Sequence, residues 1–187
     1  NRTHKGISYS APLIREIAGR TQMIQCGDRC VTGFDPNTGE QLWTVDGPSE
    51  EFVATPVYSV KAGLVFISSS WPKQIIYAIR PDGKGNVTQT HVAWRDTKGA
   101  PYVPSMMVAG DYLLTVNNFA TGFCYEAATG NVLWQEKFGR HHASPVLVNG
   151  LVYFITDDGQ LNVIKPGPQF EHIAQYQLGE NCYASPA

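Results

Sequence analysis

A short sequence pattern recurs along this 187-residue chain and constrains its fold more than any other feature. The pattern consists of an acidic residue, a short turn, a Thr-Gly pair, a further short stretch and a Trp. It is clearest in the segments 35–43 and 126–134. An internal repeat of roughly forty residues that is built from short strands is typical of blades arranged around a common axis.

A second landmark supports the same repeat. A small residue next to a proline opens each unit, and successive openings are about 40 to 50 residues apart. Trp43, Trp94 and Trp134 fall at one phase of this repeat, and Ala174 occupies that phase in the last unit. The landmarks predict one domain over residues 1–187, with units at about 10–47, 52–99, 101–139 and 141–179 and an extra opening strand at 183–187.

Each unit has the pattern of four strands, and the last unit shows it best. Apolar runs at 145–148 and 151–156 flank the turn residues Asn149 and Gly150, and further runs follow at 160–165 and 170–178. Asn-Gly between apolar runs is a strong hairpin signal. No segment of about a dozen residues shows sustained helical periodicity. The sequence therefore predicts an all-β protein, a β-propeller of four-stranded antiparallel blades.

The same pattern predicts an incomplete ring. Unclosed repeats expose the apolar sides of the first and last units, and such sides normally need caps or partners. We therefore expect the four repeats to form part of a larger ring, completed by further blades or by a second copy of the chain. A compact four-bladed closure is the alternative.

The composition excludes several classes of protein. Hydrophobic residues make up 43% of the chain and aromatic residues 11%, which is too much for general disorder. The formal net charge is -2, and the Lys and Arg residues are scattered, so no surface for nucleic acid is expected. No apolar run reaches the roughly eighteen residues of a membrane span, so no transmembrane segment is expected.

The repeated pattern, together with the small-residue-and-Pro opening, resembles the pyrroloquinoline-quinone-type (PQQ-like) β-propeller repeat over residues from about 10 to 187. That family includes quinoprotein dehydrogenases and secreted bacterial propellers without enzymatic activity, among them outer-membrane-assembly lipoproteins and many of unknown role. The resemblance implies that each Trp packs against the Thr-Gly backbone of a neighbouring repeat. Unit two departs most, because residues 81–86 form a longer turn without Thr-Gly. The implied docking residues are Trp43, Trp94, Trp134, Gly39 and Gly130.

The name of the repeat suggests a quinone cofactor, but two features of this sequence are evidence against one. Quinoprotein dehydrogenases of this type close eight blades around the quinone, commonly with two adjacent cysteines beside it and a bound calcium. This chain has too few units to enclose such an axis alone, and its cysteines include no adjacent pair. We therefore expect no cofactor and no metal site. The cysteines are Cys26, Cys30, Cys124 and Cys182.

Without a candidate nucleophile, phosphate loop or metal motif, the expected function is a non-catalytic scaffold. It would recognise a protein or polymer outside the cytoplasm, in the periplasm or after secretion. The alternative is a fragment of a quinoprotein (PQQ-dependent) oxidoreductase. Only the resemblance to the repeat family supports this alternative.

A candidate binding surface follows from the phase of the repeat. The connections that lead into each opening strand converge on one mouth of the channel of a propeller, so residues at this phase would lie at equal height around the axis. Aromatic and Arg side chains are also those that most often carry binding energy. The alternative is that these residues plug the channel or cover the ends of blades. The candidate residues are Tyr9, Phe52, Tyr102, Arg140, His141 and Tyr183.

Cys26 and Cys30 flank the expected turn between the second and third strands of unit one. Residues that face each other across so short a hairpin lie within disulfide range. A disulfide and a pair of reduced, half-buried thiols are both compatible with the sequence.

Overall fold

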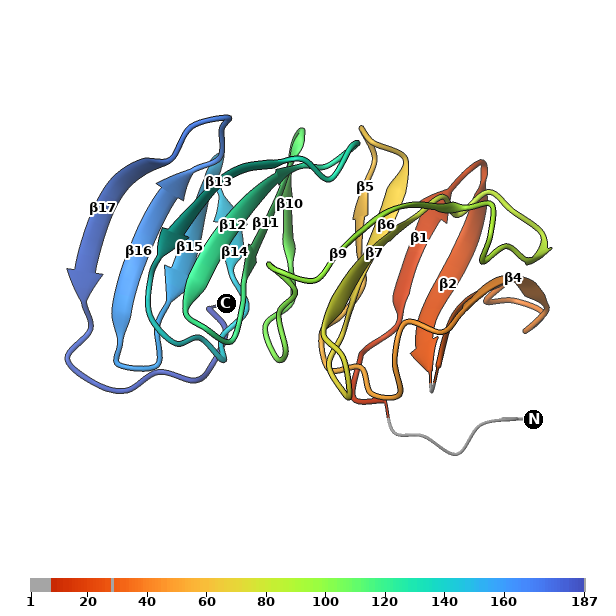
Figure 1. Cartoon of the computed structure of the whole chain (residues 1–187), viewed down its shortest axis with the longest axis horizontal. Helices are drawn as coiled ribbons and strands as arrows, with labels where there is room; N and C mark the ends of the chain where they lie inside the picture. Colours follow the sequence, from red (N-terminus) through yellow and green to blue (C-terminus); the bar gives the residue numbers. More distant parts are fainter. Residues whose placement is uncertain (1–7, 28, 187) are drawn as a thin grey trace.

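The computed structural model describes residues 8–27 and 29–186, and these residues form strands and loops without a helix. Four antiparallel sheets follow one another along the chain and stand side by side (Figure 1). We call the sheets blades one to four. This arrangement confirms the predicted all-β fold of four-stranded antiparallel blades in a partial ring, and the sheet of blade one has one additional short strand.

The strands of each blade are consecutive in the chain, except that one short strand of the second unit joins blade one. Blade one contains β1 (Leu13–Ile17), β2 (Arg20–Gly27), β3 (Cys30–Phe34), β4 (Gln41–Asp46) and β8 (Gly85–Asn86). Blade two contains β5 (Val57–Ser59), β6 (Leu64–Ser69), β7 (Ile75–Ile79) and β9 (Val92–Asp96). Blade three contains β10 (Met107–Ala109), β11 (Tyr112–Val116), β12 (Thr121–Glu126) and β13 (Val132–Lys137). Blade four contains β14 (Val146–Val148), β15 (Leu151–Ile155), β16 (Gln160–Lys165) and β17 (Glu171–Gln177).

Turn chemistry explains where the hairpins lie. Asn149 and Gly150 join β14 to β15, and both have positive φ angles, 49° and 79°. Two-residue hairpin turns of this kind need a left-handed backbone at both positions, which Asn and Gly tolerate best. The strand boundaries in blade four therefore follow from local sequence.

Three apolar clusters hold the blades together, one between each pair of neighbours. The first joins Ile24 and Val45 of blade one to Ile67 of blade two. The second joins Phe66 of blade two to Leu113 of blade three. The third lies between blades three and four. Each sheet thus buries a face against the next one, as expected for repeats that cannot bury their apolar surface alone.

Hydroxyl groups at the openings of the units link successive blades. The backbone N–H of Thr55 donates to Ser105 Oγ at 3.0 Å, that of Ser105 to Ser144 Oγ at 2.9 Å, and that of Ser144 to Ser185 Oγ at 2.9 Å. Residues 183–186 make the last of these contacts but form no strand, and position 187 lies outside the described residues.

The long turn of unit two does not dock in the expected way. Residues Gly85–Asn86 form β8, which pairs in parallel with Trp43 and Thr44 of β4. The amide of Val87 adds a hydrogen bond to Thr44 O at 2.8 Å. The turn therefore extends blade one by a fifth strand, a role that its missing Thr-Gly pair did not indicate.

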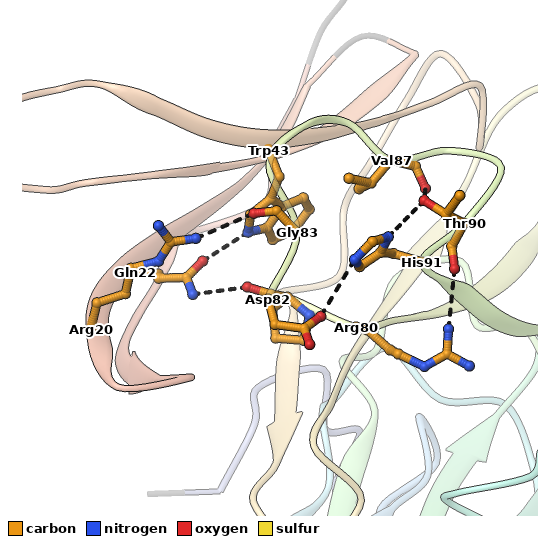
Figure 2. A network of polar contacts seen from close by, with 10 residues as sticks. Arg20, Gln22, Trp43, Arg80, Asp82, Gly83, Val87, Thr90 and His91 are labelled. Carbon is orange, nitrogen blue, oxygen red and sulfur yellow. Dashed lines mark hydrogen bonds and ion pairs between the residues drawn. The ribbon is translucent and has the colours of Figure 1, made fainter.

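A buried glutamine completes this junction (Figure 2). Gln22 is fully buried; its Oε1 accepts from Trp43 Nε1 at 2.8 Å, and its Nε2 donates to Pro81 O at 2.9 Å. Arg20 donates from the same strand to Gly83 O at 3.4 Å. The amide side chain of Gln22 thus bridges the Trp of blade one and the turn of blade two.

The hairpins between the second and third strands of each blade lie at the same edge as the connections between blades, at the bottom of the view in Figure 1. Hydrogen bonds join the two kinds of loop: Glu51 N donates to Trp71 O, Asn117 Nδ2 to Lys98 O, and Asp157 N to Arg140 O. We call this side the loop edge. It comprises residues 8–12, 47–56, 70–74, 97–106, 117–120, 138–145, 156–159 and 178–186.

Candidate functional site

The predicted surface residues all lie at the loop edge, but they differ in exposure. Tyr9 and Tyr183 are 66% and 60% exposed, and Arg140 is also exposed. Tyr102 is half-buried. Phe52 is fully buried, so the prediction that it faces a ligand is wrong.

Backbone pairing explains why Phe52 is buried. It forms a parallel bridge with Ser8, and its side chain belongs to the apolar cluster between blades one and two. Successive side chains of an extended segment point to opposite sides. Phe52 therefore points into the core, and its neighbour Glu51 points the other way.

His141 is a packing residue rather than an open surface residue. Its ring meets those of Phe138 and Phe154 edge-on, at centroid distances of 6.3 and 6.0 Å. The Nδ1 atom lies 2.6 Å from Gly139 O, while the buried Nε2 atom has no hydrogen-bond partner among the described residues. Burial lowers the pKa of His141, against the opposing effects of Gly139 O and the carboxylates of Asp157 and Asp158.

His141 gives a pH-dependent prediction. Its pKa in the folded protein lies below the ordinary value, so between the two values the unfolded chain binds a proton that the folded chain does not. Stability is therefore lost as the pH falls below about 6.5. We expect the melting temperature of the wild type to fall more between about pH 7.5 and about pH 5.5 than that of His141→Phe. Equal decreases in the two proteins would contradict this assignment.

Two groups of side chains form around the exposed aromatic residues. In the first, the hydroxyl of Tyr102 donates to Glu51 Oε1 at 3.4 Å, and Tyr9 N donates to Phe52 O at 2.8 Å. Tyr9, Glu51 and Tyr102 thus come together from distant parts of the chain. Partial burial is the largest cause that raises the pKa of Tyr102. The negative charge of Glu51, the hydrogen bond to it and the nearby Tyr9 raise this pKa further.

The second group surrounds His142. Its Nδ1 atom lies 2.9 Å from Asp157 Oδ2, and its ring meets Tyr183 edge-on at a centroid distance of 5.6 Å. Cys182 N donates to Asp157 O at 3.0 Å, which fixes the last described segment beside this hairpin. The structure therefore brings Tyr183 to His142 rather than to Tyr9 or Tyr102.

Two exposed aromatic residues at the loop edge were not predicted from the sequence. Trp71 is 59% exposed and Phe119 is 76% exposed, and both lie in hairpins between the second and third strands. Each aromatic residue stands in a polar stretch, after Ser68–Ser70 and after Asn117 and Asn118 respectively. A large aromatic residue in a polar hairpin is the signal that would have identified them.

The implied docking residues are arranged differently from blade to blade. The indole of Trp94 donates to Ala127 O at 3.0 Å, and a Cβ added to Gly130 would come within 2.5 Å of its ring. Trp134 donates to Gly167 O at 3.1 Å, in a turn that contains no Thr-Gly pair. Both tryptophans thus contact a turn of the following blade.

Trp43 and Gly39 depart from this arrangement. The ring of Trp43 lies against Gly33 of its own blade, where an added Cβ would come within 2.4 Å of the indole. Gly39 has no atom of another segment within 4 Å of its Cβ position among the described residues. In the described structure, docking on the Thr-Gly turn is therefore made at Gly130 and not at Gly39.

Cys26 and Cys30 are not joined by a disulfide. The register pairs Cys30 with Gly27 and Cys26 with Val31, so the two sulfur atoms lie on opposite faces of the hairpin. Burial is the largest cause that raises the pKa of Cys26, to about 12. Across the described residues, no three His, Cys, Asp or Glu side chains are grouped as a metal site would require.

The strand order, the blade contacts and the aromatic docking define a segment of a β-propeller built from PQQ-like repeats. The chain belongs to the family described as outer membrane protein assembly factor BamB, whose model matches residues 27–166. This match confirms the family resemblance found in the sequence.

A solved structure shows the same fold. The chain superimposes on BamB from Moraxella catarrhalis with a TM-score of 0.66 at 16% sequence identity. The match covers 88% of this chain and 47% of that protein, so the chain spans about half of its length. A search of curated proteins gave no match. None of the described residues forms a helix long and apolar enough to cross a membrane.

Proposed function

We propose that this chain is part of a non-catalytic scaffold that binds a protein partner outside the cytoplasm, through its loop edge. One observation carries the proposal: four exposed aromatic side chains, 59% to 76% exposed, are gathered at that edge. Aromatic residues are enriched at protein interfaces and often dominate the binding energy. These residues are Tyr9, Trp71, Phe119 and Tyr183.

Family membership indicates the class of partner. The family carries the name of an outer membrane protein assembly factor, so the partner we propose is a protein that takes part in outer-membrane assembly. The same membership supports a periplasmic location. The loops rather than the repeated strands would select the partner, because binding residues are disproportionately carried by loops on a rigid scaffold.

Site-specific photocrosslinking in cells tests the proposal. A photoreactive amino acid would replace Phe119 at the loop edge or Val60 at the opposite edge, in the hairpin between β5 and β6. Val60 is the matched control, because the two side chains are 79% and 76% exposed. We expect one discrete crosslinked protein from position 119 and none from position 60. Equal crosslinking from both positions, or none from position 119, would refute a partner at the loop edge.

A further inference from the structure

Four side chains at the loop edge combine aromatic rings with a carboxylate. Tyr9 precedes β1, Glu51 lies between blades one and two, Trp71 lies in the β6–β7 hairpin, and Tyr102 lies between blades two and three. We call these residues the aromatic–carboxylate patch. They are far apart in the sequence, so only the fold brings them together.

Backbone pairing sets the direction of these side chains. Glu51 and Trp71 form an antiparallel bridge, and directly paired residues point to the same face. Ser8 and Phe52 form a parallel bridge, and Phe52 points into the core. Tyr9 and Glu51 flank these two residues and therefore point to the opposite, outer side. The hydroxyl of Tyr102 reaches the same carboxylate, at 3.4 Å from Glu51 Oε1.

Two aromatic rings of the patch are open to solvent, and its half-buried carboxylate carries an unmatched negative charge. Tyr9 is 66% exposed and Trp71 is 59% exposed. Among residues 8–27 and 29–186, no Lys, Arg or His forms an ion pair with Glu51. The adjacent Glu50, in contrast, pairs with Arg29. Within the described residues, the Glu51 carboxylate thus has no cationic partner, whereas that of Glu50 has one.

We propose that the aromatic–carboxylate patch binds the cationic side chain of a Lys or Arg residue on the partner polypeptide. A cation beside aromatic rings is attracted by the negative faces of the rings, and this attraction grows when water is excluded. The Glu51 carboxylate supplies a charge-assisted hydrogen bond to the same cation. The proposal rests on the proposed function, because it specifies what the loop edge recognises.

Other ligand chemistries fit the patch less well. An anion would be repelled by Glu51. A neutral apolar side chain would bury this carboxylate without a partner, which costs free energy unless the charge is paired. Tyr102 donates its hydroxyl to the carboxylate and so holds Glu51 in place, but a single long hydrogen bond leaves acceptor sites on both carboxylate oxygens for a ligand.

Trp71 provides a direct readout of binding. The chain has four tryptophans, of which Trp43 is fully buried, Trp134 is 8% exposed and Trp94 is half-buried, whereas Trp71 is 59% exposed. The indole N–H resonances of the full chain would be followed by NMR, with the Trp71 signal assigned from Trp71→Phe. The probes are Ac-Gly-Lys-Gly-NH2, its Arg counterpart and a norleucine counterpart, which matches Lys in its aliphatic chain but has no charge. We expect a saturable shift of the Trp71 signal with the first two probes only.

Two carboxylate variants test the assignment of the charge. Glu51→Gln is expected to weaken binding of the Lys probe by about tenfold, the loss of one charge-assisted contact. Glu50→Gln is the matched control, since Glu50 is engaged by Arg29, and it is expected to leave binding unchanged. Thermal melts of both variants would establish that they are folded.

Several outcomes would overturn the proposal. Equal binding of the norleucine probe would show an apolar site, and equal weakening by the two Glu variants would show a diffuse charge effect. Binding of tetramethylammonium without binding of the Lys and Arg probes would assign the patch to a free quaternary amine. Crosslinking from position 119 with no binding of the cationic probes would refute the cation site alone, whereas no crosslinking would refute the partner at the loop edge.

Discussion

Replacing Trp134 by Ala is expected to lower the free energy of unfolding by about 3–5 kcal/mol, the usual cost of truncating a buried Trp. The side chain is 8% exposed and lies in the apolar cluster between blades three and four. Its indole donates to Gly167 O at 3.1 Å and meets Phe170 edge-on at a centroid distance of 5.1 Å. The variant loses this packing and leaves Gly167 O without its donor. Urea unfolding of the full chain, followed by circular dichroism, measures the change.

His142→Ala is the control for this prediction. The His142 side chain is 53% exposed, and the Asp157 side chain that it contacts is 17% exposed. Truncating an exposed loop side chain usually changes stability by about 0.5 kcal/mol or less, so a small decrease is expected. Equal unfolding midpoints for the two variants would show that Trp134 does not join the blades.

Much of the fold could be predicted from the sequence because its signals are local. In blade four, alternating apolar residues and the turn residues Asn149 and Gly150 locate the hairpin between β14 and β15. The small residues at the openings mark each unit, and in the structure hydroxyls at three of these positions, Ser105, Ser144 and Ser185, accept the bonds that link the blades.

The direction of individual loop side chains could not be predicted in the same way. Equal phase in a repeat sets the height of a residue along the axis, but it does not decide which side of the backbone the residue faces. The bridges from Ser8 to Phe52 and from Glu51 to Trp71 decide that question, and each joins segments far apart in the chain. The phase of the repeat therefore wrongly predicts an exposed Phe52, and it gives no indication that Glu51 and Trp71 face outward.

The contacts that join blades one and two also could not be predicted from local sequence patterns. Gln22 occupies a strand position where the equivalent residues of blades two and four are Leu64 and Leu151, so a buried polar role was not expected. Its amide connects Trp43 with Pro81 O, and β8 covers the edge of β4. The junction at Trp43 thus differs from those at Trp94 and Trp134, which bond to a turn of the following blade.

Alanine substitution at the two glycines of the repeated turn is expected to separate backbone strain from contact between blades. Gly130 and Gly39 have nearly the same backbone conformation, with φ of 76° and 74°. An L-residue pays about 1–2 kcal/mol for this left-handed conformation at either position. At Gly130 the new Cβ would also come within 2.5 Å of the Trp94 ring, whereas at Gly39 no atom of another described segment lies within 4 Å of it.

Only Gly130→Ala should therefore lower the free energy of unfolding further, because Trp94 is packed among Phe66 and Tyr125 and cannot move freely. Overpacking of this kind costs about 1–3 kcal/mol. We expect the free energy of unfolding in urea to fall by that much more for Gly130→Ala than for Gly39→Ala. Adding Trp94→Leu should bring the two glycine substitutions close to the same cost, because the ring that resists the new Cβ is gone. If both glycine variants lose the same stability in the wild-type background, the contact between Trp94 and Gly130 does not stabilise the junction of blades two and three.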